Sequence, residues 1–411
     1  MNPALAKSVA RHSLGWLAAA NAVGVLLATL LLWPGLNPPL APFTYGRWMP
    51  LHLDWQLYGW CTLPLIGALF AWFLAPQDDK SAAHARWSLR AWSVVLVLGG
   101  LAWLAGSTSG KLFLDWHGWT RSLLPLAMLA LWAALAQATQ ERQAELPRSA
   151  VVARGLMLLV LLPAPGLLYW SAGREVYPSV NPDSGGATGA ALLGSTLALV
   201  ALGGLLPQFL GLAAKPGNRR STRAYWLAFG VALLVFAAVD HGSVSHHDRN
   251  QILALGTLLA WAPLTWWYFR SFTWPDAAQR WLGAAAVWWS LLLLTGWLTF
   301  LPEFSEQMKF TNFLVAHAHL AMAGLVTSLH AAILCVLLPA GFGGRASFWT
   351  WQLGCVAHVL FLTALGLVET NSPEIFFLGS STVTHLLAGR LIAGLAMFGA
   401  SLVWWKRTLT T

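Results

Sequence analysis

The sequence predicts an all-α membrane protein, a bundle of twelve transmembrane helices with both termini in the cytoplasm. Apolar residues make up 57% of the 411 residues and charged residues only 9%, a ratio that a soluble fold of this size would struggle to keep in solution. The apolar residues form solid runs of about 20, the length that an α-helix needs to cross the hydrocarbon core. Solid runs exclude a membrane β-barrel, whose strands alternate apolar and polar residues.

Twelve such runs follow one another along the chain. The first comes after a segment without the small-residue cleavage site of a signal peptide, so we expect it to stay in the protein. No polar linker is long enough to hold a second folded domain, and we expect residues 1–411 to form one domain. The predicted spans cover residues 14–33, 51–75, 91–108, 122–139, 149–172, 186–214, 224–245, 251–269, 281–301, 311–339, 347–368 and 382–405.

Lysine and arginine residues predict the orientation of the bundle. With an even number of crossings, the side that holds both termini carries 17 of the 24 basic residues. The positive-inside rule places this side in the cytoplasm. The net charge of +9 therefore calls for no nucleic acid partner. We expect a multi-pass protein of a bacterial-type inner membrane, whose surroundings are the lipid bilayer.

Histidines gather at the outer ends of the predicted spans. His52 opens the second span, His317 and His319 open the tenth, and further histidines of this layer are His241, His246, His247 and His385. An imidazole within the membrane is costly unless it is hydrogen-bonded or ligated. One alone could be an interhelical hydrogen bond, but several at one depth favour a functional layer. We expect the deeper His330 and His358 to lie away from it.

The tenth span contains the stretch "FLVAHAHLAMAG", in which His317 and His319 are two residues apart. Successive residues of an α-helix are rotated by about 100°, so these side chains diverge by about 200°. They cannot bind one small metal ion from a regular helix, but each can bind a different planar cofactor. Haem is the natural candidate because axial ligation needs only one nitrogen per face. His52, at matching depth, could supply a second axial ligand.

Twelve spans, "GRWMPLH" at the second span and "HAHLAMAG" in the tenth resemble subunit I of the haem-copper oxidase superfamily, most closely the C-family oxidases and the nitric oxide reductases. The resemblance implies two haems, which we expect to be b-type. It implies that His317 binds the high-spin haem and that His52 and His319 bind the low-spin haem. Arg47 resembles the arginine that meets haem propionates. The chain has no CxxCH motif, so a cytochrome c or another electron donor would be a separate subunit.

The resemblance also implies a second metal, copper or non-haem iron. The family binds it through one histidine of the sixth span, which is missing here, and an adjacent pair of the seventh. If the chain is aligned with the family from the residues upstream of the pair, the pair is His246 and His247. If it is aligned from the following span, the pair falls near His241. We favour the first alignment. Oxygen ligands would favour iron over copper. Candidates to complete the set are Asp183, Asp240, His241 and Glu303.

Two functions remain open from the sequence. The first is an enzyme, a respiratory di-haem reductase for which nitric oxide reduction is the best-matched reaction. The second is a non-catalytic haem protein that relays electrons or responds to nitric oxide and has lost the second metal. The incomplete metal ligands favour the second function, and the separate high-spin ligand His317 favours the first. The tyrosine of the oxidases has no clear counterpart, which argues against oxygen reduction.

Overall fold

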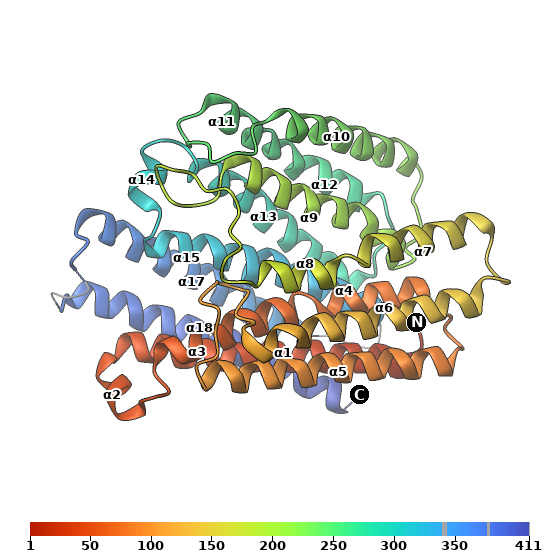
Figure 1. Cartoon of the computed structure of the whole chain (residues 1–411), viewed down its shortest axis with the longest axis horizontal. Helices are drawn as coiled ribbons and strands as arrows, with labels where there is room; N and C mark the ends of the chain where they lie inside the picture. The colour runs from red at the N-terminus through yellow and green to blue at the C-terminus, as the bar shows by residue number, and fades with distance from the viewer. Residues whose placement is uncertain (339–342, 376–378, 411) are drawn as a thin grey trace. The chain divides into compact units, whose positions relative to one another are not determined.

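The computed structural model describes residues 1–338, 343–375 and 379–410 (Figure 1). Within these ranges every regular element is a helix, and the only β-bridges are two isolated ones, between Val180 and Ala187 and between Ala214 and Phe272. Twelve helical segments are long and apolar enough to cross a membrane. The predicted all-α fold with twelve spans is therefore confirmed, whereas the side that faces the cytoplasm stays a prediction.

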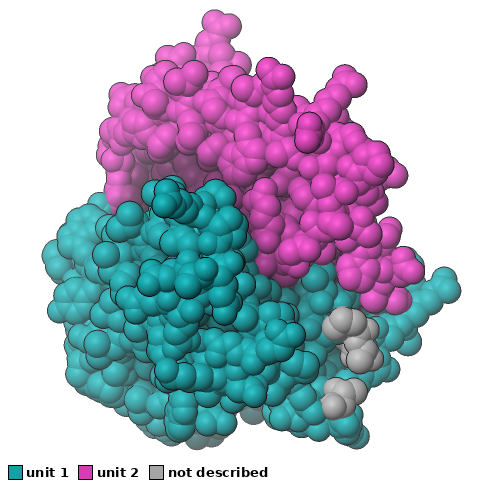
Figure 2. All heavy atoms as spheres, turned by 90° about the vertical axis from the view of Figure 1, so that its right-hand side faces the viewer, with its two compact units in different colours: residues 1–177, 333–351, 394–411 teal, residues 178–332, 352–393 magenta. Residues whose placement is uncertain are grey.

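The chain groups into two compact units, coloured separately in Figure 2. Unit 1 comprises Met1–Tyr177, Ile333–Trp351 and Gly394–Thr411, and unit 2 comprises Pro178–Ala332 and Gln352–Ala393. The single domain stays a prediction.

Unit 1 contains the first five spans and the ends of the last three helices. α1 packs against α3, the π-helical segment η2 and α4, and α5 packs along α6. The helices that lie wholly in this unit are α1 (Pro3–Leu32), α2 (Asn37–Leu40), α3 (Tyr45–Asp54), η2 (Trp55–Trp60), α4 (Leu63–Phe73), α5 (Asp79–Leu104), α6 (Leu123–Arg142), α7 (Arg148–Leu161) and α8 (Ala164–Ser171).

The two ends of the chain meet in unit 1. The side chain of Asn2 caps α1 by accepting hydrogen bonds from the backbone N–H groups of Ala4 and Leu5, so the helix starts well before the predicted span at residue 14. Arg11 donates from Nε to the carbonyl of Thr408 at 2.9 Å. Termini on one side are what an even number of crossings requires.

Unit 2 contains the sixth to the tenth spans and parts of the last two. α9 packs against α10, α11 and α12, and α13 packs along the π-helical segment η5. Its helices are α9 (Gly189–Phe209), α10 (Asn218–Ala238), α11 (Arg249–Gly256), α12 (Trp261–Arg270), α13 (Asp276–Leu298), α14 (Phe304–Met308), α15 (Asn312–His319) and η5 (Leu320–Val326), with parts of α16 (Thr327–Leu337), α17 (Arg345–Asn371) and α18 (Ser381–Thr410).

Two spans change from α-helix to π-helix within three residues of a candidate haem ligand. η2 begins three residues after His52, and η5 begins immediately after His319. Each segment is followed by a threonine whose side-chain hydroxyl donates to the backbone carbonyl five residues earlier. Thr62 donates to Leu57 at 2.8 Å, and Thr327 donates to Met322 at 3.0 Å. Short π-helical segments occur frequently at functional sites. The regular helix expected for the tenth span thus ends at His319, which leaves the divergence of His317 and His319 intact because both belong to α15.

Two carboxyl groups are buried together in unit 1. Asp54 of α3 is fully buried and Asp115, in the loop after α5, is 4% exposed. Neither oxygen of Asp54 has a hydrogen-bond partner among the described residues. Burial of an ionised carboxylate without such partners is costly, so burial favours the neutral, protonated form. Burial raises the pKa of Asp115 to about 6, while a hydrogen bond with the Gly110 backbone acts to lower it.

Replacing Asp115 with Asn is expected to flatten the dependence of stability on pH. The raised pKa means that the folded protein holds this proton more tightly than the unfolded chain does, so stability is present below the ordinary pKa near 4 and is lost as pH rises through about 6. A shift of this size corresponds to about 3 kcal/mol. Thermal unfolding in detergent between pH 4.5 and 7.5 measures it. Glu145→Gln, at an exposed carboxylate, is the control; an unchanged slope in Asp115→Asn would contradict the assignment.

Candidate functional site

Three potential metal ligands meet in unit 2. Asp183, His246 and His247 each offer one ligand atom, and these atoms all lie within 4.8 Å of one another. The two imidazole rings are 4.5 Å apart between centroids. α10 ends at Ala238, before the predicted end of the seventh span at residue 245, and both histidines lie in the loop between α10 and α11. Asp183 comes from the loop before α9.

Glu306 of α14 lies beside the two histidines of this group, and we call the four residues together the metal cluster: Asp183, His246, His247 and Glu306. Its Oε1 lies 2.8 Å from Nε2 of His247 and 3.4 Å from Nε2 of His246. The candidate carboxylate predicted from the sequence in this segment is Glu303, whereas the one beside the histidines is Glu306. Glu303 and Phe310, at the two ends of the α14 segment, have φ angles of 68° and 71°, values that non-glycine residues rarely adopt. Such backbone strain is found preferentially at functional sites.

His246 is the buried member of the metal cluster, while the other three side chains are exposed. Its Nδ1 lies 2.9 Å from the side-chain amide of Asn181, which is also fully buried. The Oδ1 of that amide accepts from the backbone N–H of Asp183 at 3.1 Å, so its Nδ2 faces the ring and donates to Nδ1. The proton of neutral His246 then resides on Nε2, which lies 3.4 Å from Oε1 of Glu306, and a metal bound at Nε2 would displace this proton. Asn181 is therefore placed to orient the imidazole.

Local hydrogen bonds hold the two loops of the metal cluster together. The hydroxyl of Ser245 donates to the carboxylate of Asp183 and accepts from the backbone N–H of His247 at 2.9 Å. Asp248, the next residue, caps α11 by accepting from two backbone N–H groups. The loop that carries Asp183 is closed by Asn181, whose N–H donates to the carbonyl of Gly186 at 2.8 Å. Local loop chemistry thus positions the adjacent histidine pair.

His241 lies outside the metal cluster. It is exposed, its Nε2 lies 2.9 Å from the carbonyl of Phe236, and its ring packs on the ring of that residue. Asp240, another candidate, accepts a hydrogen bond from the backbone N–H of Gly242. The structure thus brings together His246 and His247, the pair selected by the upstream alignment, and places Asp183 with them.

His317 faces a cavity of about 390 Å³ in unit 2. The cavity is lined mainly by apolar side chains, including Trp289, Trp297, Phe300 and Phe313. Position 296 of α13 is a glycine, and a Cβ there would lie 3.3 Å from Cε1 of His317. A cavity of this size and lining suits a flat, largely apolar group.

A hydrogen bond determines which nitrogen His317 presents. Its Nδ1 lies 3.0 Å from the hydroxyl oxygen of Thr295. That hydroxyl donates its single proton to the carbonyl of Leu291 at 2.7 Å, so it must accept from the imidazole. The proton of His317 therefore resides on Nδ1 and the lone pair on Nε2, which is the tautomer that an axial ligand needs.

The cavity adjoins the metal cluster. Phe300 lines the cavity, and its ring centroid lies 6.4 Å from that of His246. Lys309 also lines the cavity and donates to the hydroxyl of Ser184, the residue after Asp183, at 2.6 Å. Burial lowers the pKa of Lys309. A ligand of His317 in this cavity would therefore lie beside the metal cluster, with a cationic side chain at the border.

His319, on the other face of α15, contacts His358 of α17. The ring centroids are 4.6 Å apart. Nδ1 of His319 donates to the carbonyl of Val315 at 2.8 Å, and Nδ1 of His358 to the carbonyl of Arg390 at 3.2 Å. The expectation that His358 lies away from the histidine layer is wrong. The position of a residue along its own span does not reveal which residues of other helices it meets, because that depends on how the helices pack.

His52 and Arg47 lie on α3 in unit 1. Nδ1 of His52 donates to the carbonyl of Ala20 in α1 at 2.8 Å, which again puts the lone pair on Nε2. The next turn of α1 has Gly24, where a Cβ would lie 2.7 Å from Cε1 of His52. Arg47, one turn earlier, lies against Gly106, whose φ of +93° favours glycine. His52 and His317 thus have close helix contacts that depend on glycine.

No protein-family model matches this chain, and no curated protein sequence matches it. The site residues are therefore interpreted from their own chemistry. Three histidines on two helices have their lone pairs on Nε2, and one of them faces a cavity beside a group of two imidazoles and two carboxylates.

Proposed function

We propose that the protein is a haem-binding membrane oxidoreductase, a respiratory reductase subunit similar to nitric oxide reductase, with one low-spin haem, one high-spin haem and a non-haem iron. The observation that carries the proposal is the arrangement around His317. Its unprotonated Nε2 belongs to a residue that faces a cavity of about 390 Å³, and this cavity adjoins the metal cluster. A haem that is bound by a histidine and lies beside a second metal is the arrangement that a two-metal reductase needs.

The residues fit the haems in their donor chemistry. His317 would be the axial ligand of the high-spin haem, and His52 and His319 those of the low-spin haem, with Arg47 at a propionate. Each of these histidines donates from Nδ1 to an oxygen, an interaction that orients the ring and increases the basicity of Nε2. Haem would supply the redox chemistry, while the chain supplies ligation and an apolar cavity.

The metal cluster fits iron better than copper. Two imidazoles and two carboxylates offer both nitrogen and oxygen ligands. Two histidines with a carboxylate are typical of non-haem iron(II) sites, and carboxylate ligands disfavour copper(I). Asp183 and Glu306 would replace the histidine ligand that the sixth span lacks. The carboxylates would also offset the positive charge of the ion.

A non-catalytic haem protein is the alternative, because the sixth span has no histidine and three members of the metal cluster are exposed. Such a protein would relay electrons or respond to nitric oxide. In either case we place the chain in a bacterial-type inner membrane with the haem layer toward the outer side. A cytochrome c or another separate subunit would be the electron donor.

An optical spectrum combined with metal analysis tests the proposal. For the purified protein we expect two b-type haems per chain, one of them high-spin and reactive with carbon monoxide. We also expect about one iron per chain beyond the haem iron, and little copper. Reduced protein should consume nitric oxide. A purely low-spin spectrum without additional iron would support the alternative, and a preparation without haem would refute both.

A further inference from the structure

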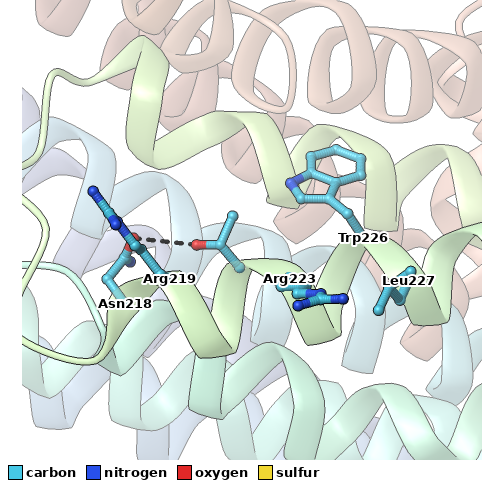
Figure 3. A pocket seen from close by; sticks show the side chains of 6 residues that line it. Asn218, Arg219, Arg223, Trp226 and Leu227 are labelled. Atoms are coloured by element: carbon cyan, nitrogen blue, oxygen red, sulfur yellow. Dashed lines mark hydrogen bonds between the residues drawn. The ribbon is translucent and has the colours of Figure 1, made fainter.

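A basic groove lies on α10, far along the helix from the metal cluster that follows its other end. It has a volume of about 450 Å³ and is lined by Asn218, Arg219, Thr222, Arg223, Trp226 and Leu227. Figure 3 shows Arg219, Arg223, Trp226 and Leu227 following one another along this helix. The spacing of four residues between the arginines places both guanidinium groups on one helix face.

The two arginines are available to an anion. Both are exposed, neither forms an ion pair with a described residue, and α10 contains no acidic residue. The neighbouring polar side chains are already engaged. Asn218 donates to the hydroxyl of Ser271 at 2.7 Å and accepts from that of Thr222 at 3.2 Å. The groove therefore has positive charge that the chain itself does not neutralise.

An apolar stripe continues from the groove into the membrane span. Leu227, Val231 and Leu234, which share a helix face, are 60%, 61% and 71% exposed. Trp226 borders the groove and is held against α9, since a Cβ at Gly204 would lie 2.8 Å from its ring. A matching ligand is anionic at one end and apolar along the rest, which describes a phospholipid, whereas a free phosphate has no apolar part to cover the stripe.

We propose that the first two turns of α10 bind the head group of an anionic phospholipid, with its phosphate between Arg219 and Arg223 and its acyl chains along Leu227, Val231 and Leu234. Guanidinium groups bind phosphate oxygens in a bidentate manner. Basic pockets at the ends of transmembrane helices bind lipids of this class. A lipid with two phosphates, such as cardiolipin, should bind most tightly because it can engage both arginines.

Native mass spectrometry of the full chain with added lipid tests the proposal. Wild-type protein should retain cardiolipin more than phosphatidylglycerol, and both more than phosphatidylcholine, and inorganic phosphate should not displace them. The double variant Arg219→Gln/Arg223→Gln should lose about 30-fold in cardiolipin affinity.

The matched control is Arg86→Gln/Arg90→Gln, which has the same spacing at the start of α5 and a neighbouring tryptophan, with Arg90 lying 4.9 Å from the Trp87 ring centroid. The control should bind cardiolipin as the wild type does. Equal losses in both double variants would show general attraction to basic residues and overturn the proposal. If the test variant does not fold, wild-type protein decides: equal retention of cardiolipin and phosphatidylcholine overturns the proposal.

Discussion

Replacing His317 with Ala is expected to remove the high-spin haem and to leave the low-spin haem in place. His317 is the histidine that lines the cavity, and its hydrogen bond with Thr295 puts the lone pair on Nε2. His319 lies on the opposite face of α15, against His358. Loss of one of two haems should lower the haem content by about half. The carbon monoxide difference spectrum of the reduced protein should disappear, because only a five-coordinate haem has a vacant position for this ligand.

Four further variants complete this experiment. His385→Ala replaces an exposed histidine of the predicted layer and should keep both haems. His52→Ala or His319→Ala should remove the low-spin signal. If His317→Ala retains a carbon-monoxide-reactive haem, the axial role of His317 is wrong. Thr295→Val retains the imidazole but removes the acceptor of its Nδ1 proton, so it should weaken haem binding by about 10- to 100-fold, as loss of such a partner typically does.

Replacing His247 with Ala is expected to abolish binding of the non-haem iron and the consumption of nitric oxide, while both haem spectra persist. Nε2 of His247 is 2.8 Å from Glu306, and the ring belongs to the group whose ligand atoms lie within 4.8 Å. Removing one of four ligands leaves an exposed site with too few donors for tight binding. Chemical assay of total iron, minus the iron accounted for by the haem spectrum, measures the effect.

His241→Ala is the matched control, since it removes a nearby histidine that lies outside the metal cluster. It should retain the iron. Asn181→Ala, which removes the partner of His246, should lower iron affinity by about 10- to 100-fold. If His241→Ala loses as much iron as His247→Ala does, the alignment from the following span is correct and the metal cluster is not the binding site.

Much of the candidate site could be predicted from local sequence. His246 and His247 are adjacent in the chain, so they could be selected as a pair without a fold. The opposite directions of His317 and His319 follow from helix geometry, since both lie in the regular helix α15. The sequence did not predict that Glu306 joins the metal cluster or that His358 contacts His319. Glu306 is one of several carboxylates at the outer ends of the spans, and His358 is one of several histidines within them.

The sequence by itself determined the all-α fold, the twelve spans and the histidine pair of the tenth span. Each depends on consecutive residues: apolar length decides whether a helix can cross the membrane, and rotation per residue decides where its side chains point. Only the tertiary structure decided that Glu306 joins His246 and His247, that His358 contacts His319, and that the helices become π-helical after His52 and His319. The first two features depend on packing between residues far apart in the chain, and the π-helical segments depart from the regular helical period, so hydropathy and helical period encode none of the three.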